Sequence, residues 1–378
     1  MRIYLDNAAT TPIDTEVFNA MTPYLLNYFG NPSSLHQQGR EARKAIEDCR
    51  ASIAELLNAS PEEIIFISGG TEADNTAIFS AVYGEGIKHV ITTRFEHHAV
   101  LHTLESLQAK GVITVSFIKH DDKGLLDIAH LIELLQESPR SLVSVMHANN
   151  EIGNLNDIEI IGELCERYNA LFHTDTVQTI GHYRHDLQKL KIHFLAASAH
   201  KFHGPKGVGF LFCRKGVKLS QLIHGGGQEG RLRAGTENIH GIVGLTKALQ
   251  IAYRHLNKHQ QYIQSLKSYM IERLISEVPG VIFNGNSANN NGSLYTVLNV
   301  GLPSVGYSRG LLECFDEHGI SVSGGSACSS GAASHVLQAI LTDVTKDNIR
   351  FSFSKLNTRA EIDKVIDALI NIYQTIAA

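Results

Sequence analysis

Residues 160–176 read "IIGELCERYNALFHTDT", a helical pattern that passes directly into a short apolar run ending in polar residues. The first part has the apolar spacing of an amphipathic helix, and the run after it is typical of a buried strand. The same alternation extends from about residue 64 to 212 through the apolar runs "IIFIS", "HVITT", "VITVSFI", "LVSVMHA", "ALFHTDT", "HFLAAS" and "GVGFLF". Strands alternating with helices predict an α/β fold whose mainly parallel sheet is covered by helices.

The pattern changes after residue 237. Residues 238–278 read as one long helical region that would connect the sheet domain to a second unit. Shorter strand and helix patterns follow, and Thr358 with Glu361 has the spacing of a capping box that opens the last helix. We therefore expect a large α/β domain over residues 16–255 and a smaller α+β domain formed by residues 1–15 and 256–378.

Composition excludes several classes of protein. The 378 residues are 43% hydrophobic and 19% charged, which allows a sizeable core. A net charge of −5 without long Lys/Arg runs argues against binding to nucleic acid or to a membrane surface. No apolar segment approaches the ~20 residues that span a bilayer. The chain's start turns polar too soon for a signal peptide. We expect a soluble cytoplasmic protein.

The cysteines show no disulfide-like spacing, which suits a reducing compartment. Four of them lie in apolar surroundings that predict burial, whereas Cys328 lies in "SGGSACSSGAAS", which has no large side chain to cover it. The five are Cys49, Cys165, Cys213, Cys314 and Cys328.

The stretch "AASAHKFHGPKGVG" (196–209) places Lys201 at the end of an apolar strand. Small residues before the lysine and a glycine-rich turn after it let a ligand approach the backbone closely. A desolvated lysine amine can form a Schiff base with an aldehyde. These neighbours favour a nucleophilic lysine over an exposed lysine at a strand end.

Two other strand ends carry polar residues. In "FISGGTEADNTAIF" (66–79) a Gly-Gly turn leads into a helix whose free N–H groups could bind a phosphate, with Thr71 adding a hydroxyl. An ordinary strand-to-helix turn is the alternative. In "FHTDTVQ" (172–178) Asp175 ends a strand, where ligands bind in open α/β sheets. A carboxylate that merely caps the next turn is the alternative.

Histidines suggest a different chemistry. His98 and His102 are four residues apart, so they could bind zinc from one helix face together with His97. This motif lacks the glutamate of H-E-x-x-H. A zinc hydrolase is therefore an alternative from another class, and the main interpretation has no metal.

A Schiff-base lysine, a phosphate-binding helix start and a strand-end aspartate are the three groups that hold pyridoxal 5′-phosphate. At this point the chain resembles the class V, fold-type I aminotransferase superfamily, and within it the NifS/IscS-like cysteine desulfurases. The resemblance rests, in chain order, on "YLDNAATTP", "GNPSSLH", "SGGTEADN", "EHHAV", "HANNEIG", "HTDTVQ", "AHKFHGPKGVG", "GGGQEG", "RAGTEN", "SGGSACSSG" and "IRFSFS".

The resemblance implies a role for each matching residue. Lys201 would hold the cofactor's aldehyde and move protons. Asp175 would pair with the ring nitrogen, Gln178 would bind the ring hydroxyl, and His97 would stack on the ring. The phosphate would be held by Gly70, Thr71, Ser198, His200 and, from the neighbouring subunit of a homodimer, Thr236.

For the substrate, the resemblance implies that Asn150 and Arg350 bind the carboxylate of L-cysteine. Cys328, on an accessible loop, would take the sulfur as a persulfide and release alanine. The sulfur would then pass to an acceptor such as an iron–sulfur scaffold protein or to a thiolation pathway. A selenocysteine lyase or C–S lyase is the alternative within the superfamily. An aminotransferase and a catalytically silent scaffold remain further alternatives.

Overall fold

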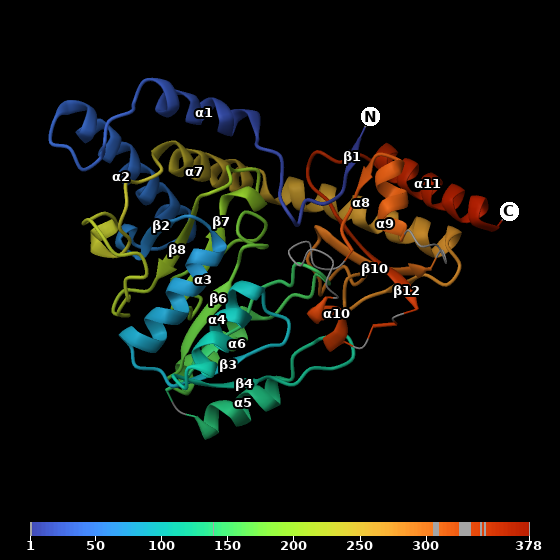
Figure 1. Cartoon of the computed structure of the whole chain (residues 1–378), viewed down its shortest axis with the longest axis horizontal. Coiled ribbons are helices and arrows are strands. Elements are labelled where there is room, and N and C mark those ends of the chain that lie inside the picture. Colours follow the sequence, from blue (N-terminus) through green and yellow to red (C-terminus); the bar gives the residue numbers. More distant parts are fainter. Residues whose placement is uncertain are drawn as a thin grey trace.

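The computed structural model describes residues 2–138, 140–304, 310–324, 334–340, 342–343 and 345–377. A seven-stranded sheet in the order β2-β8-β7-β6-β5-β3-β4 lies at the centre of the large α/β part (Figure 1). Its strands are β2 (Ile64–Ile67), β3 (His89–Thr92), β4 (Thr114–Phe117), β5 (Leu142–Ser144), β6 (Leu171–Asp175), β7 (Phe194–Ser198) and β8 (Gly209–Cys213).

Every apolar run noted in the sequence forms one of these strands. Within this sheet, β8 pairs antiparallel with both of its neighbours, and the other pairings are parallel. The predicted mainly parallel sheet is confirmed. Because β6 and β7 are parallel neighbours, with Asp175 opposite Ala196, their carboxyl ends open at the same edge of the sheet.

Helices cover both faces of the sheet because successive strand side chains point to opposite sides. On one face the core joins the sheet to α2 (Gln37–Leu57), α5 (Ile128–Glu137), α6 (Ile158–Arg167) and α7 (Ile239–Arg254). On the other face it joins the sheet to α3 (Gly70–Phe79) and α4 (His98–Ala109). Helix α1 (Thr15–Leu26) adds Val17 and Met21 to the first of these cores.

The prediction of one continuous helical region over residues 238–278 is wrong, because the structure has two helices there. The region is divided at His255 (φ −111°, ψ 14°) into α7 and α8 (Leu256–Glu277). Helix α7 packs into the core of the sheet, whereas Ile263, Leu266 and Met270 of α8 belong to a second core. The two helices therefore pack mainly into different cores.

The second core belongs to the α+β part that carries the C-terminus (Figure 1). Its antiparallel sheet has the order β12-β10-β9, and β1 pairs in parallel with β11. These elements are β1 (Ile3–Tyr4), β9 (Ile282–Phe283), β10 (Val297–Pro303), α9 (Leu311–Glu317), β11 (Ile320–Ser321), α10 (His335–Ala339), β12 (Lys346–Ser352) and α11 (Arg359–Ala377). The domain limits at residues 15/16 and 255/256 stay a prediction.

Short helical turns complete the chain: η1 (Pro61–Glu63), η2 (Ser80–Gly84), η3 (Ala199–Lys201) and η4 (Glu229–Arg231). The predicted capping box is confirmed, because Thr358 N–H donates to Glu361 Oε2 at 2.8 Å and Glu361 N–H donates to Thr358 Oγ1 at 3.3 Å. Among the described residues, no helix has the length and apolar character needed to cross a membrane.

Candidate active site

Lys201 ends the 3-10 turn η3 that follows strand β7. Its amine Nζ donates hydrogen bonds to the carbonyl oxygens of Ala8 (2.6 Å) and Ala9 (3.0 Å). The N-terminal segment thus crosses the turn that carries the lysine, and Thr11 Oγ1 fixes it there by donating to His200 O at 2.9 Å. The small residues around Lys201 are needed for packing, because a Cβ on Gly209 would lie 2.2 Å from Ala197 O.

The amine faces a cavity of about 200 Å³. Ten of the residues predicted from the sequence line this cavity: Gly70, Thr71, His97, Asn150, Asp175, Gln178, Ser198, His200, Lys201 and Arg350. They come from the carboxyl ends of β6 and β7, the starts of α3 and α4, the loop after β5, and β12. Ligands bind at this edge of an open α/β sheet.

Asp175 is the last residue of β6 and is 6% exposed. Burial raises the pKa of its carboxyl, while the N–H of Val177, 2.8 Å from Oδ1, and the nearby charge of Lys201 oppose the shift. A buried carboxylate of this kind favours a protonated partner in the cavity. The site therefore suits a cationic ring nitrogen at this point.

Helix α3 begins beside Asp175, at Gly70. A Cβ on Gly70 would lie 2.6 Å from Val177 Cγ2, so a larger residue would displace the side chain of Val177, which lines the same cavity. Gly69 has φ 153°, a backbone conformation that favours glycine. Thr71, Ser198 and His200 line the same space. Free N–H groups and hydroxyls together make this end of the cavity suited to a phosphate.

His97 caps α4, because its Nδ1 accepts a hydrogen bond from Ala99 N–H at 3.1 Å. Burial, and then the charge of Lys201, lower the pKa of His97 to about 4. His97 is therefore neutral at pH 7, and because Nδ1 accepts from Ala99, the ring proton lies on Nε2. The imidazoles of His98 and His102 stack with centroids 4.5 Å apart and planes at 25°. Among the described residues, no cluster of three or more histidine, cysteine, aspartate or glutamate side chains could hold a metal ion. The zinc site proposed for His97, His98 and His102 is therefore wrong.

Arg350, on β12, is 1% exposed and reaches the cavity from the opposite side. Its Nη2 donates to Asp6 Oδ1 at 2.8 Å and its Nη1 donates to Asn150 O at 2.9 Å. Within the described part of the chain, Arg350 Nε is buried without a hydrogen-bond partner. The guanidinium of Arg350, with the neutral Asn150 beside it, thus gives this wall of the cavity a group that can bind a carboxylate.

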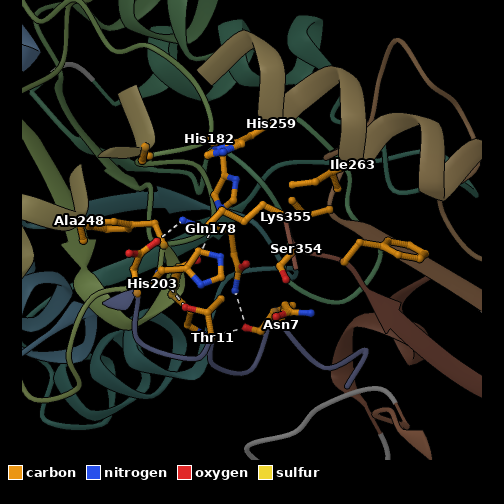
Figure 2. A pocket seen from close by; sticks show the side chains of 18 of the residues that line it. Asn7, Thr11, Gln178, His182, His203, Ala248, His259, Ile263, Ser354 and Lys355 are labelled. Carbon is orange, nitrogen blue, oxygen red and sulfur yellow. Dashed lines mark hydrogen bonds and ion pairs between the residues drawn. The ribbon is translucent and has the colours of Figure 1, made fainter. Parts of the chain in front are cut away.

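A smaller cavity of about 30 Å³ lies behind Gln178 and Lys201 (Figure 2). Figure 2 shows Gln178 beside His203, whose N–H donates to Thr11 Oγ1 at 2.8 Å and whose Nδ1 lies 2.9 Å from Pro12 O in the N-terminal segment. Gln178 Nε2 donates to Ala8 O at 3.0 Å, and His182 Nδ1 lies 2.8 Å from the Tyr295 hydroxyl. Since Ala8 O accepts from both Gln178 and Lys201, this back wall fixes the resting position of the lysine.

Two predicted residues are not brought to the cavity. Thr236 is exposed and lines a separate pocket of about 220 Å³ with Gly207 and Arg233. Cys328 lies outside the described residues. Of the four cysteines predicted to be buried, Cys49, Cys165 and Cys213 are buried, and Cys314 is partly buried.

Sequence reasoning missed several residues that line the cavity: Ala8, Ala9, Asp74, Met146 and Val177. A helical turn separates Asp74 from Gly70, so the i, i+4 spacing could have placed both on one face. The contact of Ala8 with Lys201 joins residues 193 positions apart and has no local signal.

Comparisons with known proteins agree with this architecture. The family model described as aminotransferase class-V matches residues 3–365. A relative named cysteine desulfurase IscS, from Dictyoglomus turgidum, is 41% identical and aligns with 98% of this chain and 94% of its own length.

Solved structures give the same answer. A NifS-like protein superposes with a TM-score of 0.89 at 36% identity and covers 100% of both chains. A protein described as SspA in complex with cysteine superposes with a TM-score of 0.80 at 32% identity, covering 95% of this chain and all of its own. The fold-type I architecture expected from the sequence is confirmed. The chain belongs to the class-V aminotransferase family and, within it, to the NifS/IscS-like cysteine desulfurases.

Proposed function

We propose that this chain converts L-cysteine to L-alanine with pyridoxal 5′-phosphate and transfers the sulfur to Cys328 as a persulfide. One observation carries the proposal: Lys201, Asp175 and the start of α3 converge on one cavity. The relatives named cysteine desulfurase, and the similar protein described in complex with cysteine, support the choice of substrate.

The residues present fit the cofactor, which enzymes of this family use. The amine of Lys201 would hold the aldehyde, and buried Asp175 would pair with the ring nitrogen. The part of the cavity lined by Gly70, Thr71, Ser198 and His200 would hold the phosphate. When bound, pyridoxal phosphate supplies an electron sink that weakens the bonds at the substrate's Cα and Cβ.

The chain's own residues then perform separate tasks. Arg350 and Asn150 hold the substrate carboxylate, which orients the Cα–H bond toward the cavity. Lys201 Nζ accepts the Cα proton, and its hydrogen bonds to Ala8 and Ala9 set the position to which the amine returns. His97 is neutral because its pKa is lowered to about 4, and since Nδ1 accepts from Ala99 N–H, it acts as a donor through Nε2–H.

The sulfur step needs a thiolate. Cys328 Sγ would attack the substrate sulfur, so that an S–S bond forms as the Cβ–S bond breaks, and the bound cofactor would supply the capacity to take up the electron pair of that bond. Protonation then yields alanine, so L-cysteine and the Cys328 thiol give L-alanine and the Cys328 persulfide without an external oxidant. A second thiol later takes the sulfur by exchange.

Alanine and sulfide release from L-cysteine, with a thiol reductant present, tests the proposal. The wild-type protein releases both, and Cys328→Ala loses sulfide release. Cys314→Ala, which changes a partly buried cysteine on α9, is the matched control and keeps the wild-type rate. Equal turnover by the wild type and Cys328→Ala contradicts the persulfide step.

We also propose that the active unit is a homodimer in which Thr236 of the partner subunit contacts the phosphate. The support is the exposure of Thr236 and its place outside the cavity of its own chain. The proposal also includes an acceptor that takes the persulfide sulfur, either an iron–sulfur scaffold protein or a component of a thiolation pathway. It further includes a cytoplasmic location. Cysteines without disulfide-like spacing support a reducing compartment.

A further inference from the structure

One lining residue of the cofactor cavity has no part in the chemistry described so far. Asp74 lies on α3, one helical turn after Gly70, and is 1% exposed. It lines the same cavity as Asp175 and Lys201. A carboxyl group buried this completely needs a partner or must remain protonated.

The nearest partner of Asp74 is His173. Asp74 Oδ1 lies 3.3 Å from His173 Nε2, and both atoms lack an aligned hydrogen bond to any described residue. His173 lies on β6 two residues before Asp175, so both side chains project from the same face of the strand. On its other side, His173 Nδ1 lies 2.9 Å from Ser144 Oγ. Asp74 thus contacts the buried imidazole of His173, and Asp175, two residues further on the same face of β6, lies close enough for its charge to act on Asp74.

The charges around Asp74 decide its protonation. Asp175 and Glu96 face it as carboxyl groups, and Lys201 is the cation that acts on Asp175. Burial, followed by repulsion from Asp175 and Glu96, holds the pKa of Asp74 well above its usual range. Burial lowers the pKa of His173 to about 3. An undissociated acid and a neutral imidazole are thus the stable pair, with one proton between them.

Resting on the cofactor placement proposed above, we propose that Asp74 is a positioning residue for the ring-nitrogen end of pyridoxal phosphate. As an undissociated acid that shares its proton with His173, it leaves Asp175 as the ionised carboxylate on this wall. A second carboxylate beside Asp175 would compete for the ring nitrogen's proton. The neutral side chain also fills space next to Asp175, which keeps water away from the ion pair.

The experiment uses the holoenzyme and follows the visible band of the bound cofactor during a pH titration, together with the rate of cofactor release. Asp74→Asn copies the neutral acid and keeps a donor for His173. Asp74→Ala removes both the donor and the volume. Thr76→Ala, on the same helix but outside the cavity lining, controls for general loosening of α3.

The proposal predicts that Asp74→Asn keeps the wild-type titration midpoint and release rate. Asp74→Ala releases the cofactor several-fold faster and moves the midpoint by about half a pH unit or more, because water reaches Asp175. If Asp74→Asn shifts the midpoint as far as Asp74→Ala does, Asp74 is ionised and the proposal is overturned. If Asp74→Ala lowers only the melting temperature, as Thr76→Ala does, the role is merely structural and the proposal is also overturned.

The wild-type protein separates this proposal from the proposed function. A wild-type protein that binds no cofactor and shows no visible band contradicts the cofactor placement itself. The other case is a wild-type protein that shows the visible band, with Asp175→Asn shifting the band strongly. If the Asp74 variants then give either of the overturning results, only the role of Asp74 is contradicted, and the cofactor placement stands.

Discussion

Arg350 donates a hydrogen bond through Nη2 to Asp6 Oδ1 at 2.8 Å, so two residues 344 positions apart meet at the cofactor cavity. The same guanidinium donates through Nη1 to Asn150 O. Asp6 therefore compensates the buried charge of Arg350. Under the proposed function, the substrate carboxylate would bind at Arg350 Nε, which has no partner among the described residues, and fork-like binding of this kind is what arginine favours.

Arg350→Lys tests this arrangement. Lysine keeps the positive charge but loses the fork, and one lost charged hydrogen bond is worth about 1.5–3 kcal/mol. We expect KM for L-cysteine to rise about 10- to 100-fold in steady-state assays, with a smaller change in kcat. Arg273→Lys is the matched control, because Arg273 pairs with Glu277 and Asp363 away from the cavity. A KM for Arg350→Lys equal to that of Arg273→Lys would falsify the role of Arg350.

Gly70→Ala tests the phosphate end of the cavity. A Cβ there would lie 2.6 Å from Val177 Cγ2, so the side chain of Val177, which lines the cavity, must shift. We expect about a 10-fold or larger loss of pyridoxal phosphate affinity, measured by titrating the apoprotein. Gly310→Ala is the control, because a Cβ at Gly310 meets no described atom within 4 Å. Unchanged cofactor affinity in Gly70→Ala would mean that the phosphate binds elsewhere.

Buried histidines predict the pH dependence of stability. Burial lowers the pKa of the following histidines to between about 3 and about 4: His97, His173, His182, His185, His193, His200, His203 and His259. In the unfolded chain a histidine has a pKa of about 6.5, so between about pH 6.5 and about pH 4 the unfolded chain binds more protons than the folded chain does. The free energy of unfolding therefore falls as the pH falls through this window.

Three carboxyls oppose that trend, because the pKa values of Asp74, Glu96 and Asp175 are raised and their folded forms bind the extra protons. Below about pH 6.5 the unfolded histidines are mostly protonated and outnumber these carboxyls, so the net slope keeps its sign. Urea unfolding between about pH 6.5 and 5 measures this slope. His182→Gln flattens it, while exposed His224→Gln leaves it unchanged. A stability that rises toward pH 5 would contradict these assignments.

Mixed dimers test the position of Thr236. Lys201→Ala and Thr236→Ala chains are each expected to be impaired at limiting cofactor. In a mixed dimer, one site combines Lys201 of one chain with Thr236 of the partner subunit and is intact. Random mixing then restores about a quarter of the wild-type activity, because half of the dimers carry one intact site of two. No recovery on mixing would show that Thr236 acts on the site of its own chain.

Local patterns predicted much of the fold. The apolar runs that became β2 to β8 are short and bounded, and a strand buried on both faces has that signature. The break at His255 was not predictable, because helical periodicity continues through it and only tertiary packing separates α7 from α8. The pairing of β1 with β11 is likewise a non-local contact.

The residues of the site likewise fall into those that local sequence patterns predict and those that depend on contacts between distant segments. Gly70, Asp175 and Lys201 each stand where a strand ends, so their convergence follows from the parallel sheet. Contacts of Ala8 with Lys201, and of Asp6 with Arg350, depend on where the N-terminal segment crosses the sheet edge. Asp74 was missed because its partner, His173, lies on a different element and appears in the sequence as one more buried strand residue.

Reduction of the holoenzyme with borohydride, followed by digestion and mass spectrometry, is the most direct test of the central claim. The lysine–cofactor linkage becomes a stable amine, and the account predicts that the peptide containing Lys201 gains one reduced pyridoxyl phosphate group. Lys201→Arg should lose this label, while Lys355→Arg, which changes a lysine paired with Asp14 in the cavity behind, should keep it. A reduced holoenzyme whose label lies on another lysine, or on none, would contradict the account.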